Sequence, residues 1–125
     1  CDQTAEYNNI QIQKPLNYKS AISQLTELSG QRVNFHSAIC LYQKKTDILE
    51  KKVISFDVKY KKITLSQIEN YLEKEKPFDC VGSVKSEGLG ITILEEINSS
   101  DPTAVIGLPL ITLVNMLSKA GISIT

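Results

Sequence analysis

Two stretches of alternating apolar and polar residues constrain the fold of this chain more than any other feature. The first, RVNFHSAICLY, spans residues 32–42, and the second, VISFDVKY, spans residues 53–60. Because successive side chains of a strand point to opposite faces of a sheet, a period of two indicates a strand with one apolar face. The polar link QKKTD follows the first stretch, so the pattern predicts a β-hairpin. The apolar faces would carry Val33, Phe35, Ile39 and Leu41 on one strand, and Ile54, Phe56, Val58 and Tyr60 on the other.

Three further segments have the apolar spacing and the end signals of helices. We expect them between Asn17 and Gly30, between Thr64 and Pro77, and between Pro109 and Gly121. The second helix has the clearest start, because Thr64 and Gln67 form a capping-box pattern.

The remaining segments complete an α/β chain. Residues 79–90 hold three glycines and are expected to be a loop, whereas ITILEEI at 91–97 and TAVIG at 103–107 are expected to be strands. A length of 125 residues suits one modest domain. The sequence therefore predicts a single domain over residues 1–125, with a mixed sheet and flanking helices.

Charge and hydropathy argue against two classes of partner. The chain has 14 Lys and Arg residues against 14 Asp and Glu residues, whereas a protein that binds polymeric nucleic acid normally carries excess positive charge. The longest apolar stretch, residues 104–117, contains Gly107 and Pro109 and is too short to span a bilayer. We expect neither a nucleic acid nor a membrane as partner.

The cysteines indicate a reducing compartment. Cys1, Cys40 and Cys80 are odd in number and widely spaced, which fits neither a disulfide framework nor a paired-cysteine zinc site. The cytoplasm is the simplest location. A processed lipoprotein, which would also begin with cysteine, is the alternative, although no flexible tether follows Cys1.

Polar side chains that could take part in catalysis or binding lie mainly in two short segments. Asp2 and Gln3 stand near the start, and Lys14 follows before a proline. The other piece is GSVKSEGLG at 82–90, in which Lys85 and Glu87 lie among glycines. Glycines let backbone approach a ligand closely, and backbone amides can face phosphate oxygens.

In this order the motifs resemble the Maf family of nucleoside triphosphate pyrophosphatases. The family pattern includes S-D-Q, G-K-P, a helix ending in L-S-G, a strand with V-x-x-x-T, a helix with I-x-x-Y, a glycine-rich loop and V-G-L-P-L. This chain has CDQ at 1–3, QKP at 13–15, LSG at 28–30, VNFHS at 33–37, IENY at 68–71 and VIGLPL at 105–110. The resemblance covers the whole chain and implies a Maf/ITPase-like fold.

The glycine-rich loop resembles that of the branch that hydrolyses 7-methyl-GTP to 7-methyl-GMP and pyrophosphate. Many family members carry glutamine where this chain has Glu87. A guanine edge offers two donors, N1–H and the 2-amino group, which one carboxylate accepts as a pair. Methylation at N7 makes the base cationic, which further favours a nearby negative charge.

The resemblance also implies roles for individual residues. Asp2 would accept the proton of the attacking water, or equally hold a divalent cation, Mg or Mn, that bridges the phosphates. Lys14 would neutralise phosphate charge. Gln3 and Glu87 would bind the nucleoside triphosphate and set base choice, and Lys85 would be a further neighbour of its phosphates or base.

Two expectations concern what the resemblance does not cover. Family members carry a serine-proline-arginine-arginine segment before the position of Asp2, and Cys1 and Gln13 stand where serine and glycine are usual. We therefore expect this chain to correspond to the carboxy-terminal portion of a family member and to turn over weakly by itself. The alternative function is a catalytically inactive module that binds nucleotide or dimerises, and a homodimer is the expected assembly.

Overall fold

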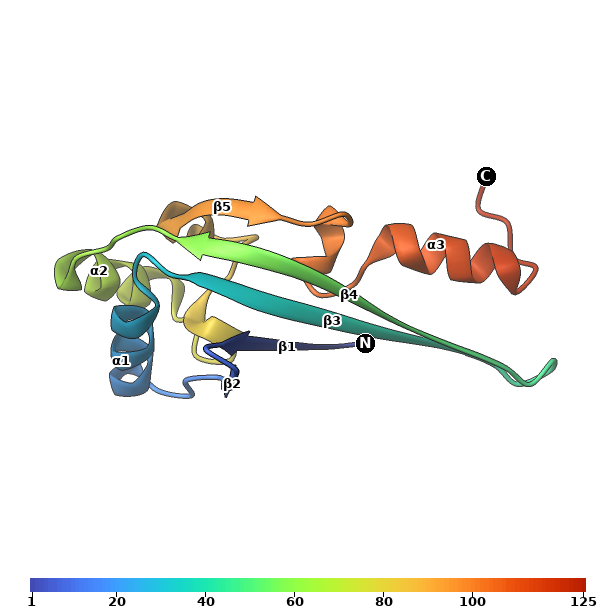
Figure 1. Cartoon of the computed structure of the whole chain (residues 1–125), viewed down its shortest axis with the longest axis horizontal. Helices are drawn as coiled ribbons and strands as arrows, with labels where there is room; N and C mark the ends of the chain where they lie inside the picture. Colours follow the sequence, from blue (N-terminus) through green and yellow to red (C-terminus); the bar gives the residue numbers. More distant parts are fainter.

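The computed structural model describes residues 1–125 and contains one five-stranded sheet in the order β2-β1-β3-β4-β5 (Figure 1). Its strands are β1 Asp2–Tyr7, β2 Ile10–Ile12, β3 Arg32–Gln43, β4 Ile48–Tyr60 and β5 Leu94–Asn98. Every pair of neighbouring strands is antiparallel. The predicted α/β class with flanking helices is confirmed, although no parallel pairing contributes to the sheet.

The predicted hairpin is the central pair of the sheet, β3 and β4. Val33 lies opposite Val58, and Phe35 lies opposite Phe56, whose ring stacks on that of Phe35 at 5.3 Å between centroids. The strands are longer than predicted, since pairing continues to Gln43 and Ile48 at the turn. The far half of the hairpin consequently extends well beyond the rest of the sheet (Figure 1).

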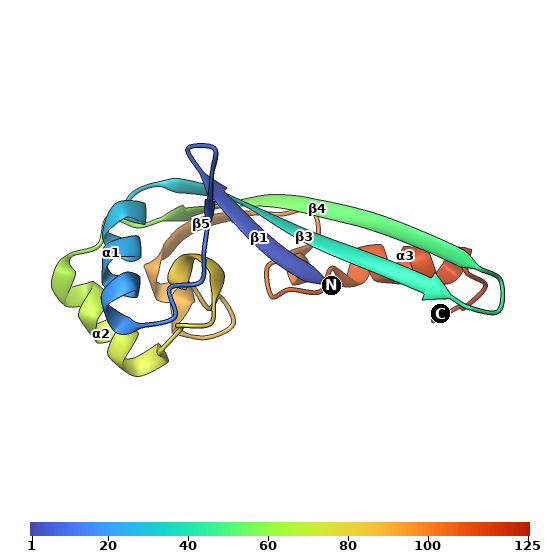
Figure 2. The ribbon, with the colours of Figure 1, turned by 90° about the horizontal axis from the view of Figure 1, so that it is seen from below.

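Two helices cover one face of the sheet at the opposite end from the hairpin turn (Figure 2). Helix α1, Tyr18–Leu28, begins after Asn17, whose side chain accepts a hydrogen bond from the Ser20 amide. Helix α2, Leu65–Glu75, begins with the predicted capping box. Their buried side chains pack against the inner face of β3 and β4 to form the core, whose helical members are Ala21, Leu25, Leu28, Ile68, Tyr71 and Leu72.

The third helix, α3 Leu110–Lys119, lies alongside the outer half of the hairpin (Figures 1 and 2). It begins after Pro109, as predicted, but Met116 is its one buried residue. This end of the molecule therefore has little core of its own.

The expected strand at 103–107 is wrong. A short 3-10 helix, η3 Pro102–Ala104, occupies this position, and a turn follows it. The Asp101 carboxylate accepts hydrogen bonds from the Thr103 hydroxyl and from the Thr112 amide, and so holds the segment in a turn. Pro102 also lacks the amide hydrogen that a strand ladder requires.

Two other boundaries differ from expectation. Strand β5 begins at Leu94 because residues 89–93 form a 3-10 helix, η2 Leu89–Ile93, and a second short one, η1 Val81–Ser83, interrupts the expected loop. No helix of the fold is long and apolar enough to cross a membrane.

The opening residues form a hairpin, β1–β2, that the sequence reasoning missed. Its turn consists of Asn8 and Asn9, both with positive φ (52° and 61°). Asparagine tolerates this conformation and is favoured in two-residue hairpin turns. The Asn-Asn pair was therefore the available signal.

Candidate active site

A polar hollow of about 280 Å³ forms where the start of β1, the end of the β1–β2 hairpin and two loops meet. Pairing of Ala5 with Ile12 brings the chain back along β1, so Lys14 returns towards the level of Gln3. The hollow is lined by Cys1, Asp2, Gln3, Lys14, Asp79, Cys80, Val81, Val84, Ser86, Glu87, Val105, Ile106 and Gly107. Of the five site residues predicted from sequence, four are brought together here and Lys85 is not.

Asp2 presents an open carboxylate at the edge of the hollow. Its Oδ1 accepts a hydrogen bond from the Gln3 amide at 2.9 Å, and none of the ion pairs in the structure involves it. Lys14, on the same hollow, is likewise exposed and free of an ion pair. Both charges are thus available to a ligand.

Gln3 is already occupied by the protein. Its Nε2 donates to Ser37 Oγ at 3.0 Å and to the Ala104 carbonyl at 3.0 Å. Ser37 is fully buried and donates to the same carbonyl at 2.9 Å. Gln3 and Ser37 therefore fasten the 104–107 turn to the sheet. Of the Gln3 side-chain amide, only the oxygen Oε1 remains for a ligand.

Lys85 does not line the polar hollow. Its Nζ lies 3.5 Å from Oε1 of Glu75, at the end of α2.

Cys80 lines the hollow as an unpaired thiol. Burial, together with the neighbouring Asp79 carboxylate, raises the pKa of this thiol to about 11. Since the thiolate is the nucleophilic form, Cys80 is inert near neutral pH.

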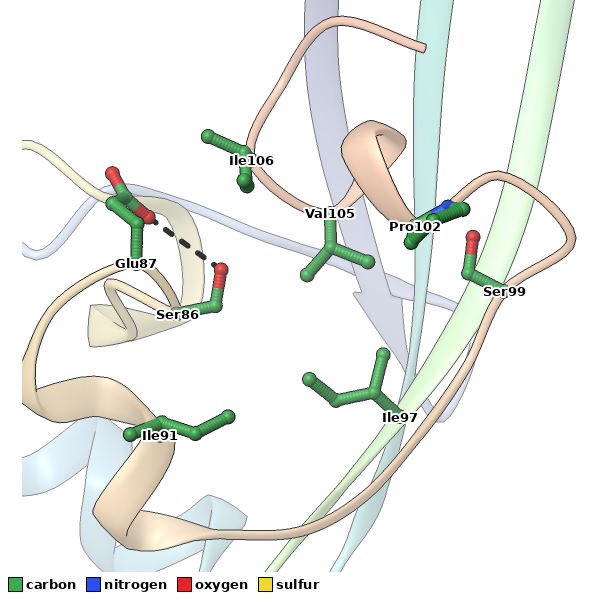
Figure 3. A pocket seen from close by; sticks show the side chains of 8 residues that line it. All are labelled: Ser86, Glu87, Ile91, Ile97, Ser99, Pro102, Val105 and Ile106. Atoms are coloured by element: carbon green, nitrogen blue, oxygen red, sulfur yellow. Dashed lines mark hydrogen bonds between the residues drawn. The ribbon is translucent and has the colours of Figure 1, made fainter. Parts of the chain in front are cut away.

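Glu87 also lines a second, apolar hollow of about 330 Å³ (Figure 3). Ile91 and Ile97 form one side of it, facing Val105 and Pro102, while Glu87 and Ser86 stand at its rim (Figure 3). Ile106 and Ser99 complete the lining. The two hollows share one wall, made of Ser86, Glu87, Val105 and Ile106. Sequence reasoning missed the apolar hollow because its members come from η2, β5 and η3.

The chain contains no group of three or more His, Cys, Asp or Glu side chains arranged to hold a metal ion. The polar hollow is lined by three carboxylates, Asp2, Asp79 and Glu87, but they are not placed together as ligands of one ion. Mg²⁺ usually binds through one or two carboxylates together with substrate phosphates and water. The donor set fits a cation that arrives with a nucleotide, and it does not fit a cation held by the protein alone.

Comparison with known proteins agrees with these motifs. A family model described as "Maf-like protein" matches residues 1–120. A 7-methyl-GTP pyrophosphatase of Methylobacillus flagellatus is 45% identical over 99% of this chain and 65% of its own length. One of Nitrosospira multiformis is 45% identical over 98% of this chain and 62% of its own length, so the chain spans less than two thirds of these curated relatives. The family match, together with this similarity, shows that the chain belongs to the Maf-like family.

Proposed function

We propose that this chain hydrolyses 7-methyl-GTP to 7-methyl-GMP and pyrophosphate. The observation that carries the proposal is that Asp2, Lys14 and Glu87, from three separate segments, line one hollow. Relatives named 7-methyl-GTP pyrophosphatase share 45% of its residues.

At the phosphate end, Asp2 accepts a proton from the attacking water. Water forms a bond to the α-phosphorus, the bond from that phosphorus to the bridging oxygen breaks, and pyrophosphate leaves. The proton taken by Asp2 passes to solvent. Lys14 stabilises the charge that develops on the phosphate oxygens, and a fixed cation at such a point typically contributes about 100-fold in rate. In the alternative role, Asp2 would instead hold Mg²⁺ or Mn²⁺ together with the substrate's phosphate oxygens, and the cation would supply further charge neutralisation.

At the base end, the apolar hollow takes one face of the purine. Ile97, Val105 and Pro102 offer apolar surface there, and Glu87 stands at the rim with its carboxylate unpaired by any cation. That carboxylate accepts the two donors of the guanine edge, and its charge favours a base made cationic by N7 methylation. The hollow and the carboxylate together favour 7-methyl-GTP over UTP.

The decisive experiment incubates the 125-residue chain with 7-methyl-GTP, GTP and UTP in the presence of Mg²⁺, and separates products by chromatography. We expect slow turnover, because the chain spans less than two thirds of its relatives. It should give 7-methyl-GMP and pyrophosphate in equal amounts and fall about 1,000-fold further in Asp2→Asn. Glu50→Gln, on the outer part of β4, is the control. Unchanged turnover in Asp2→Asn would overturn the assignment of Asp2. Binding without turnover in the unaltered chain would favour the inactive nucleotide-binding module instead.

We also propose that the chain forms a homodimer. Support comes from α3, on which Leu110, Ile111 and Val114 are 45%, 53% and 42% exposed. Neighbouring exposed apolar side chains favour association. Light scattering should give twice the chain mass of 13.9 kDa, and Ile111→Lys should return the mass to that of one chain. A single-chain mass for the unaltered protein at every concentration would contradict the proposal.

The proposed compartment is a reducing cytoplasm. All three cysteines are free thiols, and such thiols persist in a reducing environment. Cell fractionation with an antibody to the chain would test this location.

A further inference from the structure

The loop that carries Glu87 is held in place by a second carboxylate, Glu75, the last residue of α2. Oε2 of Glu75 accepts a hydrogen bond from the Leu89 amide at 2.7 Å, and its Oε1 lies 3.5 Å from Nζ of Lys85. The Glu75 side chain is 11% exposed. One largely buried carboxylate therefore contacts the loop on both sides of Glu87.

The loop lies close to Glu75 at Gly88 and close to its own backbone at Gly90. A Cβ atom at Gly88 would lie 2.6 Å from Oε2 of Glu75 and would displace that side chain, whereas one at Gly90 would collide with the Lys85 backbone. The amides of Gly88 and Gly90 both donate to the Lys85 carbonyl, at 3.0 and 2.9 Å. Residues 85–90 thus form a closed turn that sits directly on the Glu75 carboxylate.

Helix α2 makes a second connection to the same loop through Tyr71. The Tyr71 hydroxyl donates to the Ser83 carbonyl at 3.0 Å and accepts from the Lys85 amide at 3.2 Å. Burial raises the pKa of Tyr71 above its ordinary value, so the hydroxyl keeps its proton. The loop is consequently fixed to α2 from residue 83 to residue 89.

Glu87 itself takes no part in these connections. Its one side-chain hydrogen bond is to Ser86 Oγ at 3.5 Å, and its residue is exposed. The loop is held firmly, whereas the carboxylate at its tip is left free.

We propose that Glu75 is a positioning residue for base selection: it holds the 85–90 turn so that the Glu87 carboxylate meets the purine edge in a preformed geometry. This inference rests on the function proposed above. It gives Lys85 a role in the same arrangement, as the cation that pairs with Glu75. Glu75 itself contacts no substrate and acts only through the position of Glu87. Its effect is therefore expected on the ratio of affinities for two bases.

The first test measures the loop without any nucleotide. Amide hydrogen exchange of Leu89 should accelerate at least about tenfold in Glu75→Ala, because the amide loses its acceptor. Glu73→Ala, an exposed position on the same helix, is the matched control and should leave the exchange unchanged. Equal protection of Leu89 in the Glu75→Ala and unaltered chains would overturn the proposal.

The second test compares binding of 7-methyl-GTP and UTP by calorimetry in Glu75→Ala, Glu87→Ala and the double variant. Each single change should reduce the preference for 7-methyl-GTP about tenfold, and the double variant should lose no more than Glu87→Ala alone, because both act through one carboxylate. Additive losses, or a preference that persists in Glu75→Ala, would overturn the proposal. No preference in the unaltered chain would instead overturn the proposed function.

Glu75→Gln keeps the comparison valid if Glu75→Ala does not fold. Its amide oxygen still accepts from Leu89, but the charge that faces Lys85 is gone. We expect normal melting and a smaller loss of preference, about threefold. Lys85→Met removes the other partner of the ion pair. If the preference for 7-methyl-GTP were unchanged in both Glu75→Gln and Lys85→Met, the ion pair would have no role in base selection.

Discussion

The polar and the apolar hollow share one wall, but their other lining residues differ in chemical character. Across the shared wall, the polar hollow presents Asp2, Lys14 and Asp79, whereas the apolar hollow presents Ile91, Ile97 and Pro102. A nucleotide has the same division, with a charged triphosphate at one end and a flat base at the other. Under the proposed function, the rate of hydrolysis and the choice of base depend on different residues, and Glu87, on the shared wall, belongs to both hollows.

The largest effect that would separate the hollows is expected for Lys14→Met. Loss of the cation should reduce kcat/KM about 100-fold for 7-methyl-GTP, GTP and UTP alike, since all three carry the same triphosphate. Steady-state kinetics with the three nucleotides would measure it, and Lys19→Met, an exposed lysine on α1, is the control. A loss confined to one base would contradict the division.

Glu87→Gln should have an intermediate and selective effect. The amide can accept only one of the two guanine donors through its oxygen, so kcat/KM for 7-methyl-GTP should fall about tenfold while that for UTP changes less than about twofold. The ratio of the two values is the measurement, with Glu69→Gln on α2 as control. An equal fall for both nucleotides would place Glu87 with the phosphate residues.

Ile97→Val should sharpen the comparison from the apolar side. Removing one methylene group from the wall should raise KM for 7-methyl-GTP about fourfold and leave kcat unchanged, as expected for lost apolar contact of about 0.8 kcal/mol. Ile10→Val on the exposed β2 strand is the control, and melting temperatures would exclude a loss of folding. A lower kcat at constant KM would mean that the apolar hollow takes part in the chemistry.

The smallest effect is expected for Cys80→Ser, which should leave turnover unchanged. The folded-state pKa of about 11 lies above the ordinary value of 9.0, so the thiol stays protonated until pH rises well above neutral. At pH 8, iodoacetamide should modify Cys80 about 100-fold more slowly than a cysteine with the ordinary pKa. Rapid modification accompanied by loss of turnover would give the polar hollow a nucleophile that the division does not include.

Features determined by neighbours in sequence were predictable. The β3–β4 hairpin followed from a period of two, and the start of α2 followed from Thr64 and Gln67. The 103–107 segment was assigned wrongly because its conformation depends on Asp101, whose partner Thr112 lies eleven residues away. An apolar composition alone did not reveal that contact.

The candidate site was predictable in its members but not in its geometry. Motif order indicated Asp2, Lys14 and Glu87, and all three line the polar hollow. No pattern along the chain indicated that Lys85 would turn towards Glu75, because the direction of a long side chain depends on which charges the fold brings near. The apolar hollow was missed for a similar reason, since its lining residues come from separate elements.

The hydrogen bond from Gln3 to the Ala104 carbonyl joins residues 101 positions apart in the chain. Contacts between residues so far apart in the sequence form late in folding, because closing the loop between them costs conformational entropy that other contacts must first offset. During synthesis the start of β1 emerges from the ribosome long before residue 104 exists, so the polar hollow can assemble only when almost the whole chain is available. A nucleotide that binds as proposed would therefore meet a finished site or none, and could assist folding only at its last step.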